Sequence, residues 1–236
     1  MWSSYFEAMC YESLPEGDTI TLKDNPEAFK LILNYMYKGQ TDLPSVELAI
    51  QVYQLADKYI MDHLKSVCSK VLGEATNSFF SSPSIGALRR DSLKQLLAED
   101  LTVSSELVIF KGILNWCRAH LIDQGTEVTS TSLRKESDIF LPEVRFLTMS
   151  LSDFVKHVVP ERILSLEEVE TIQLKIAGDP NVNISPLFTN NTEKRGRFNI
   201  SQLRTCKIMR NKGRIGGHFV GHFGPERFTN PQIFLM

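Results

Sequence analysis

The sequence predicts a mainly α-helical fold with a remnant of β-strand. Apolar residues recur every three or four positions over much of residues 4–177, which is the spacing that gives a helix one buried face. Patterns typical of a helix start, with Ser or Asn at the cap position, precede several of these runs. One short stretch, residues 19–22, alternates between polar and apolar side chains in the manner of a half-buried strand.

The first helix is predicted to begin at Ser4. The Ser4 hydroxyl can accept from the amide three residues later, and the Glu7 side chain can reach back to the Ser4 amide, which is the spacing of a capping box. The side chains expected on one side of this helix are Tyr5, Phe6, Met9 and Cys10. Pro15 and Gly17 then interrupt regular structure before the predicted strand.

Three further helices are expected before residue 72. Asn25 is the predicted cap of the first, with Pro26 at its first helical position and Gly39 after its end. Ser45 is the predicted cap of the second. The apolar stripes are Phe29, Ile32, Leu33 and Met36; Ala49, Val52, Tyr53, Ala56 and Ile60; and Met61, Leu64, Cys68 and Val71. Because helices close in sequence pack as neighbours, we expect one small core.

These motifs resemble the second half of a BTB/POZ domain. The matching runs are SSYFEAM, PEAFKLILNYMYKG and YQLADKY, in that order and over roughly residues 2–72. The resemblance implies a protein-interaction module that is truncated at its front, assigned here to residues 1–72. The strands and helices that would come first carry much of the dimer interface in that family, so we expect a homodimer of this chain to lack them.

The next segment is predicted to be a linker followed by a second helical domain. Residues 73–86 contain four Ser together with Asn77 and Pro83 and the apolar pair Phe79 and Phe80, and helical spacing resumes at Leu88. Ser104 is a candidate cap for a helix that buries one face. The residues on or beside that face are Leu107, Ile109, Phe110, Ile113, Leu114, Trp116 and Cys117.

This second domain, residues 87–177, resembles a shortened BACK domain, the helical module that commonly follows BTB/POZ. Leu101, Val103, Glu106 and Trp116 occupy the positions where that family has the same residue types. Residues 124–137 are expected to be a polar loop. Ser150 and Ser165 are the predicted caps of two closing helices, with apolar faces at Leu151, Phe154, Val155 and Val158, and at Leu166, Val169, Ile172 and Ile176.

Residues 178–236 are expected to be a mostly disordered basic tail. Periodicity fades after Gly178, and Lys and Arg are frequent between residues 194 and 214. The tail offers nucleic-acid binding as an alternative function, because basic residues interleave with Phe198, Phe219 and Phe223. A solvated tail is the favoured interpretation, so no nucleic-acid partner is expected.

Composition indicates a globular protein that works without a membrane. The chain has 236 residues, 42% of them hydrophobic, and a net charge of −2, so no overall field attracts it to nucleic acid or to acidic lipids. No apolar run approaches the roughly 20 residues that span a bilayer. The widely spaced cysteines fit buried structural thiols, and therefore a cytoplasmic or nuclear location.

No motif indicates an enzyme, a cofactor or a metal. His63, His120 and His157 stand on predicted helices, and no sequence pattern typical of a metal site includes them. His218 and His222 have a metal-like separation, but no further ligand accompanies them. Glycines near Arg195 and Arg214 lack the preceding strand of a phosphate-binding loop.

The predicted site is therefore a contact surface. By resemblance to the family, the helix at Ser4 and the hydrophobic-x-Glu element at residues 14–16 would dock the N-terminal helices of cullin-3. The contact candidates are Phe6, Met9, Tyr11, Leu14, Glu16, Tyr53 and Tyr59. The alternative places Phe6, Met9 and Tyr53 in the core and leaves Glu16 as a solvated turn residue.

The resemblance implies an adaptor that brings an unknown substrate protein to a cullin-3 ubiquitin ligase. A scaffold or transcriptional cofactor that uses the same surfaces without a ligase is the alternative.

Overall fold

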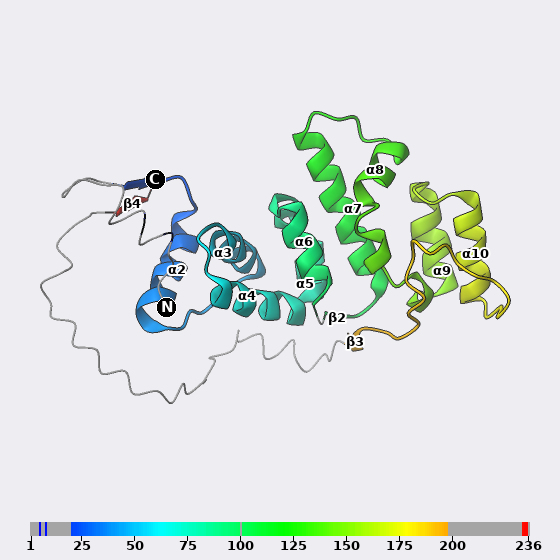
Figure 1. Cartoon of the computed structure of the whole chain (residues 1–236), viewed down its shortest axis with the longest axis horizontal. Helices are drawn as coiled ribbons and strands as arrows, with labels where there is room; N and C mark the ends of the chain where they lie inside the picture. The colour runs from blue at the N-terminus through cyan, green and yellow to red at the C-terminus, as the bar shows by residue number, and fades with distance from the viewer. Residues whose placement is uncertain (1–4, 6–7, 9–19, 100, 198–232, 236) are drawn as a thin grey trace, which may run out of the picture. The chain divides into compact units, whose positions relative to one another are not determined.

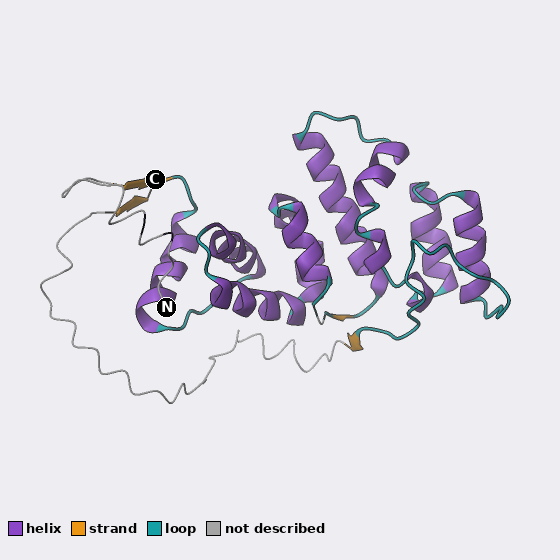
Figure 2. Ribbon diagram, in the orientation of Figure 1, coloured by secondary structure: helices purple, strands orange, loops and turns teal. Residues whose placement is uncertain are grey.

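The structure is a computed structural model of the chain and describes residues 5, 8, 20–99, 101–197 and 233–235. The described residues are mainly helical, with a few very short strands (Figure 2), which confirms the predicted fold class. The chain divides into two compact units: unit 1 comprises Met1–Cys68 and Leu203–Met236, and unit 2 comprises Ser69–Gln202.

The described residues of unit 1 include two full helices, the start of a third, and a pair of strands (Figure 1). The elements are β1 (Ile20–Leu22), α2 (Pro26–Lys38), α3 (Val46–Lys58), the first half of α4 (Asp62–Glu74), and β4 (Ile233–Leu235). Strands β1 and β4 pair in parallel, with Ile20 opposite Ile233. The predicted caps are confirmed: the Asn25 side chain accepts from two amides of α2, and Ser45 accepts from the amide of Leu48.

The core of unit 1 lies between α2 and α3. Its fully buried apolar side chains include Phe29, Ile32, Ala49, Ile50, Val52, Ala56 and Leu64. Ile60, expected in the same stripe, is 58% exposed. The reason is local: α3 ends at Lys58, and Ile60 takes a left-handed backbone conformation with φ +54°, which turns its side chain out of the stripe.

Unit 2 is a succession of short helices around one long helix. Its elements are α5 (Thr76–Ser81), η2 (Pro83–Ala87), α6 (Arg90–Leu97), β2 (Thr102–Val103), α7 (Glu106–Asp123), α8 (Ser130–Ser137), η3 (Leu141–Glu143), η4 (Phe146–Thr148), α9 (Leu151–Asp153), η5 (Phe154–Val158), η6 (Val159–Glu161), α10 (Leu166–Ile176) and β3 (Gly196–Arg197). Helix η5 is a π-helical turn that continues α9.

Helix α7 forms the centre of unit 2 because it packs against α5, η2 and α8. Its apolar side chains are buried over most of its circumference, as Ile109, Phe110, Ile113, Leu114, Trp116 and Cys117. The Trp116 indole Nε1 donates to the carbonyl of Leu88 at 2.8 Å, so the one polar atom of this buried ring has a partner. The cap of α7 is Ser105, one residue after the predicted Ser104.

The segment expected as a linker, residues 73–86, is folded into unit 2 instead. It forms the end of α4, then α5 and most of η2, and it buries Phe79 and Phe80 almost completely. Phe80 lies against Gly112 of α7 so closely that a Cβ on Gly112 would come within 2.4 Å of its ring. The close approach of α5 to α7 therefore depends on a glycine far away in sequence.

Two other local expectations differ from the structure. Part of the loop expected at residues 124–137 is helix α8, which begins with a capping box between Thr129 and Ser132. Helix α10 begins at the predicted Ser165 box, but Leu166 is 90% exposed. Burial on α10 begins one turn later, since Val169 is half-buried and Ile172 fully buried.

Residues 179–197, here called the strap, follow α10 and return along unit 2. The strap was expected to be the start of a disordered tail, but it buries Ile184 and Phe188, and Phe188 meets Phe146 edge-on at 5.5 Å. It ends in β3, which pairs in parallel with β2 (Figure 1). The rest of the expected tail, apart from residues 233–235, lies outside the described residues. None of the helices in the described part of the chain is long and apolar enough to cross a bilayer.

Candidate functional site

The predicted contact surface is only partly within the described residues. Its members Phe6, Met9, Tyr11, Leu14 and Glu16 lie outside them, so their role stays a prediction. Tyr53 and Tyr59 are described, and both are core residues, 1% and 0% exposed. These two tyrosines therefore present no surface to a partner, and for Tyr53 the structure agrees with the alternative interpretation of the sequence.

Tyr59 links the end of α3 to the residue that precedes the cap of α2. Its hydroxyl donates to the Asp24 carboxylate, which also accepts from the Lys58 ammonium at 2.7 and 2.9 Å. Its ring meets the edge of Phe29 at 5.9 Å. Burial, and then the hydrogen bond to Asp24, raise the pKa of Tyr59, so the phenol remains a neutral donor at physiological pH.

Unit 1 also exposes aromatic side chains that the sequence reasoning did not single out as contacts. The rings of Tyr35 (α2) and His63 (α4) stack with centroids 6.0 Å apart, and the Tyr35 hydroxyl hydrogen-bonds to His63 Nδ1. Tyr37, near the end of α2, is 69% exposed. The Tyr-Met-Tyr run at residues 35–37 indicates an exposed tyrosine, because two tyrosines two positions apart cannot both face the core of one helix.

In unit 2 the most enclosed charged group is Glu106, at the first position of α7. Its side chain is 1% exposed and faces Arg195 of the strap, whose side chain is 6% exposed. Arg195 Nε lies 3.3 Å from Glu106 Oε2, and its Nη2 donates to the Glu143 carbonyl at 2.8 Å. The arrangement gives a buried carboxylate a cationic partner, as burial of a charge requires.

Arg145 adds a second link between Glu106 and the strap. Its main-chain amide donates to Glu106 Oε1 at 3.0 Å, while its guanidinium donates to the Glu193 carbonyl at 2.9 Å. Glu106 thus joins α7, the segment around η4 and the strap. This cluster therefore holds three segments of unit 2 together.

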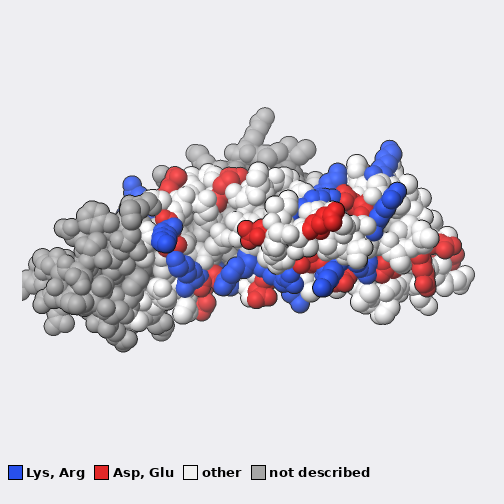
Figure 3. Space-filling model, turned by 90° about the horizontal axis from the view of Figure 1, so that it is seen from above, with Lys and Arg blue, Asp and Glu red and all other residues white. Residues whose placement is uncertain are grey.

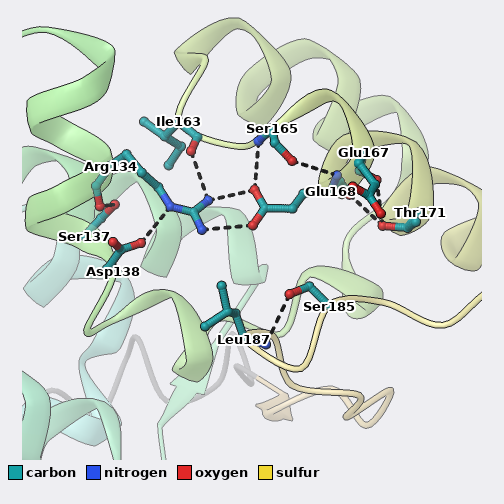
Figure 4. Close-up of polar contacts among 10 residues, drawn as sticks. All are labelled: Arg134, Ser137, Asp138, Ile163, Ser165, Glu167, Glu168, Thr171, Ser185 and Leu187. Carbon is teal, nitrogen blue, oxygen red and sulfur yellow. Dashed lines mark hydrogen bonds and ion pairs between the residues drawn. The ribbon is translucent and has the colours of Figure 1, made fainter.

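Arg134 of α8 is the hub of a second polar network (Figure 4). Its Nη1 and Nη2 donate to the two carboxylate oxygens of Glu168 at 2.8 and 2.9 Å, and its Nε donates to Asp138 at 2.6 Å. Nη1 also reaches the carbonyl of Ile163 at 3.0 Å. Burial acts to raise the pKa of Glu168, but the bonds from Arg134 and the Ser165 amide outweigh it and lower that pKa.

His120 belongs to a third polar group and has no metal-like surroundings. Its ring stacks on Trp116 at 4.7 Å, and its Nε2 lies 3.7 Å from the buried Glu136 carboxylate, which also accepts from Arg90. In the described parts of the chain, no three His, Cys, Asp or Glu side chains gather as a metal site. His218 and His222 lie outside those parts.

Charges of both signs are mixed on the surface. On the face seen in Figure 3, Lys and Arg lie among Asp and Glu over the described residues rather than in one basic patch. A surface that binds nucleic acid would require clustered Lys and Arg side chains. The described residues on this face show no such cluster.

Comparisons with known proteins agree with these observations. The sequence model of the BTB/POZ domain matches residues 1–76, and that of BACK, described as BTB And C-terminal Kelch, matches residues 49–159. The chain is 30% identical over 206 residues to human BTB/POZ domain-containing protein 6, covering 73% of this chain and 38% of that protein. For the mouse protein of the same name the identity is 31%, with the same shares. Human BTB/POZ domain-containing protein 3 is 27% identical, over 73% of this chain and 39% of that protein.

The chain therefore spans about two fifths of the length of these relatives. The two domain models, which overlap over residues 49–76, occur in the order that the sequence motifs predicted, and the mainly helical structure is consistent with such a pair. The chain belongs to the family of proteins that carry a BTB/POZ domain followed by a BACK domain.

Proposed function

We propose that this chain is a non-enzymatic adaptor, the substrate-receptor subunit of a cullin-3 ubiquitin ligase. The observation that carries the proposal is the succession of a BTB/POZ segment and a BACK segment in one chain. The mechanism is bridging: the BTB side holds the ligase scaffold, and the rest of the protein holds a target. Holding both on one chain raises the local concentration of target near the ligase without any chemistry on the adaptor itself.

The proposed docking element is the pair Leu14 and Glu16, with Phe6, Met9 and Tyr11 on or beside the preceding helix. An apolar anchor next to a charge suits such a contact, because the anchor supplies affinity and the charge fixes the register. Tyr53 and Tyr59 are removed from the docking set because they are buried. They belong to the core of unit 1.

The test is a titration of the purified chain with the N-terminal helical domain of cullin-3. The variant Leu14→Ala plus Glu16→Ala should weaken binding at least about tenfold, the loss expected from removing one hot spot. The matched control is Leu166→Ala plus Glu170→Ala, the same residue types on exposed positions of α10. The control should bind like the unaltered chain.

Two results would contradict the proposal. Unaltered chain that fails to bind cullin-3 would favour the scaffold alternative. Equal binding by the unaltered chain and by the Leu14→Ala plus Glu16→Ala variant would show that a different surface is used.

A further inference from the structure

The strap carries a serine followed by proline at a position that the solvent reaches. Ser185 is half-buried, whereas Pro186 is exposed and Leu187 is 52% exposed. The other Ser-Pro pair in the sequence begins with Ser82, which is only 5% exposed and accepts from the Ser84 amide at the start of η2. The two pairs therefore have the same local sequence signal and very different accessibility.

We propose that Ser185 is a phosphorylation site for a proline-directed protein kinase, and that a phosphate there detaches the strap from unit 2. In the transfer, the Ser185 Oγ forms a bond to the γ-phosphorus of ATP while the bond from that phosphorus to the β,γ-bridging oxygen breaks. ADP leaves, and the serine hydroxyl proton passes to the base of the kinase. ATP and the kinase are the only co-reactants.

The surroundings of Ser185 are unfavourable to a phosphate. Ser185 lines a cleft of about 400 Å³ whose charged lining residues are Glu167 and Glu168 in the first turn of α10. Figure 4 shows both glutamates on α10 and Ser185 on the strap across from them. A phosphoserine carries roughly −1.5 to −2 charges at pH 7, and next to carboxylates it disrupts a contact by repulsion.

The nearby cation, Arg134, already donates hydrogen bonds to other groups. Arg134 donates to both oxygens of Glu168, to Asp138 and to the Ile163 carbonyl, so four of its five N–H groups are already used. Two amides at the start of α10 are also occupied. The amide of Ser165 donates to Glu168 and the amide of Glu168 donates to Ser165, which completes a capping box.

Ser185 lies next to the buried side chains that hold the strap against unit 2. Ser185 is the first residue of a turn in which the Phe188 amide donates to its carbonyl at 3.0 Å, and Ile184 and Phe188 on either side of that turn are buried. A kinase that reads extended backbone must open this turn and withdraw Phe188. Phosphorylation therefore takes place on the opened strap, and the added charge opposes the return of the strap to α10.

The first experiment maps the phosphate. The whole folded chain is treated with MgATP and a proline-directed serine kinase and is analysed by peptide mass spectrometry. We expect phosphate on Ser185 and none on Ser82, and no phosphate at either site in the Ser185→Ala variant. The urea-unfolded, diluted chain is the control for the kinase, because there both serines should be modified. A folded chain modified at Ser82, or left unmodified at Ser185 when the unfolded chain is modified there, would overturn the proposal.

The second experiment measures release of the strap by hydrogen exchange. Phosphorylated chain should exchange the amides of residues 184–197 at least about tenfold faster than untreated chain, while the amides of α7 should be unchanged. Glu167→Gln should reduce that acceleration, because it removes one of the repelling charges but leaves the Arg134 network intact. Unchanged exchange in residues 184–197 after complete phosphorylation would refute the release step.

Discussion

Arg195 and Glu106 lie 89 positions apart in the sequence and form an ion pair whose side chains are almost sealed from solvent. The pair joins the end of the strap to the first turn of α7. The strap is thereby part of the helical fold of unit 2, since its arginine is the cation that faces the buried carboxylate.

Arg195→Ala should destabilise unit 2 by about 3 kcal/mol, because removing one partner leaves the other charge buried and uncompensated. The measurement is urea unfolding followed by circular dichroism. The same substitution should cost clearly less in a Glu106→Gln background, where the buried group is neutral and can still accept from the Arg145 amide. Equal costs in the two backgrounds would show that Arg195 acts through its carbonyl contacts alone.

The sequence predicted those parts of the fold that rest on local chemistry. Asn25, Ser45, Ser150 and Ser165 were predicted as helix caps and are confirmed, because a cap requires only a side-chain oxygen and an amide two or three residues later. Helix α5 was missed because its support is distant in sequence. Its Ser- and Asn-rich composition favours a loop, and its stability depends on the contact of Phe80 with Gly112.

The candidate site was harder to predict for a related reason. Periodicity shows which residues share a helix face, but it does not show which face a neighbouring element covers. The family resemblance suggests Tyr53 and Tyr59 as contacts, whereas periodicity places Tyr53 in an apolar stripe, and the structure buries both side chains. The strap was missed because Arg195 reads as one basic residue among many until its partner Glu106 is brought beside it.

Gly112→Ala tests the contact between α5 and α7. Alanine normally favours a helix over glycine by about 1 kcal/mol, so a stabilising effect would be the default expectation. Here the new Cβ would lie 2.4 to 2.9 Å from three atoms of Phe80, so we expect a net destabilisation of about 1–3 kcal/mol from overpacking. Asn115→Ala, at an exposed position of the same helix, is the control and should leave the melting temperature nearly unchanged.

Cys68 and Cys117 should be unreactive towards thiol reagents in the folded chain. Burial raises the pKa of each thiol to about 12, so the nucleophilic thiolate is scarce at neutral pH, and both side chains are fully enclosed. Alkylation at pH 7.5 followed by peptide mass spectrometry should find both cysteines unmodified before unfolding and modified after it. Labelling of either one at the rate of a free thiol would contradict the structure.

The Arg134–Glu168 pair should make the stability of unit 2 depend on pH in the acidic range. The folded-state pKa of Glu168 is below its ordinary value of 4.5, so the contribution of the pair is complete above that value and is lost as the pH falls through the lower, folded pKa. Glu168→Gln removes this titration and one charge-assisted acceptor, which should cost about 1–2 kcal/mol at pH 7. In urea titrations of both proteins, the difference in unfolding free energy should therefore narrow between pH 5 and pH 3. Glu170→Gln, at an exposed position of the same helix, is the control and should show no such narrowing. If the difference in unfolding free energy for Glu168→Gln stays constant with pH, the pair contributes packing and not charge.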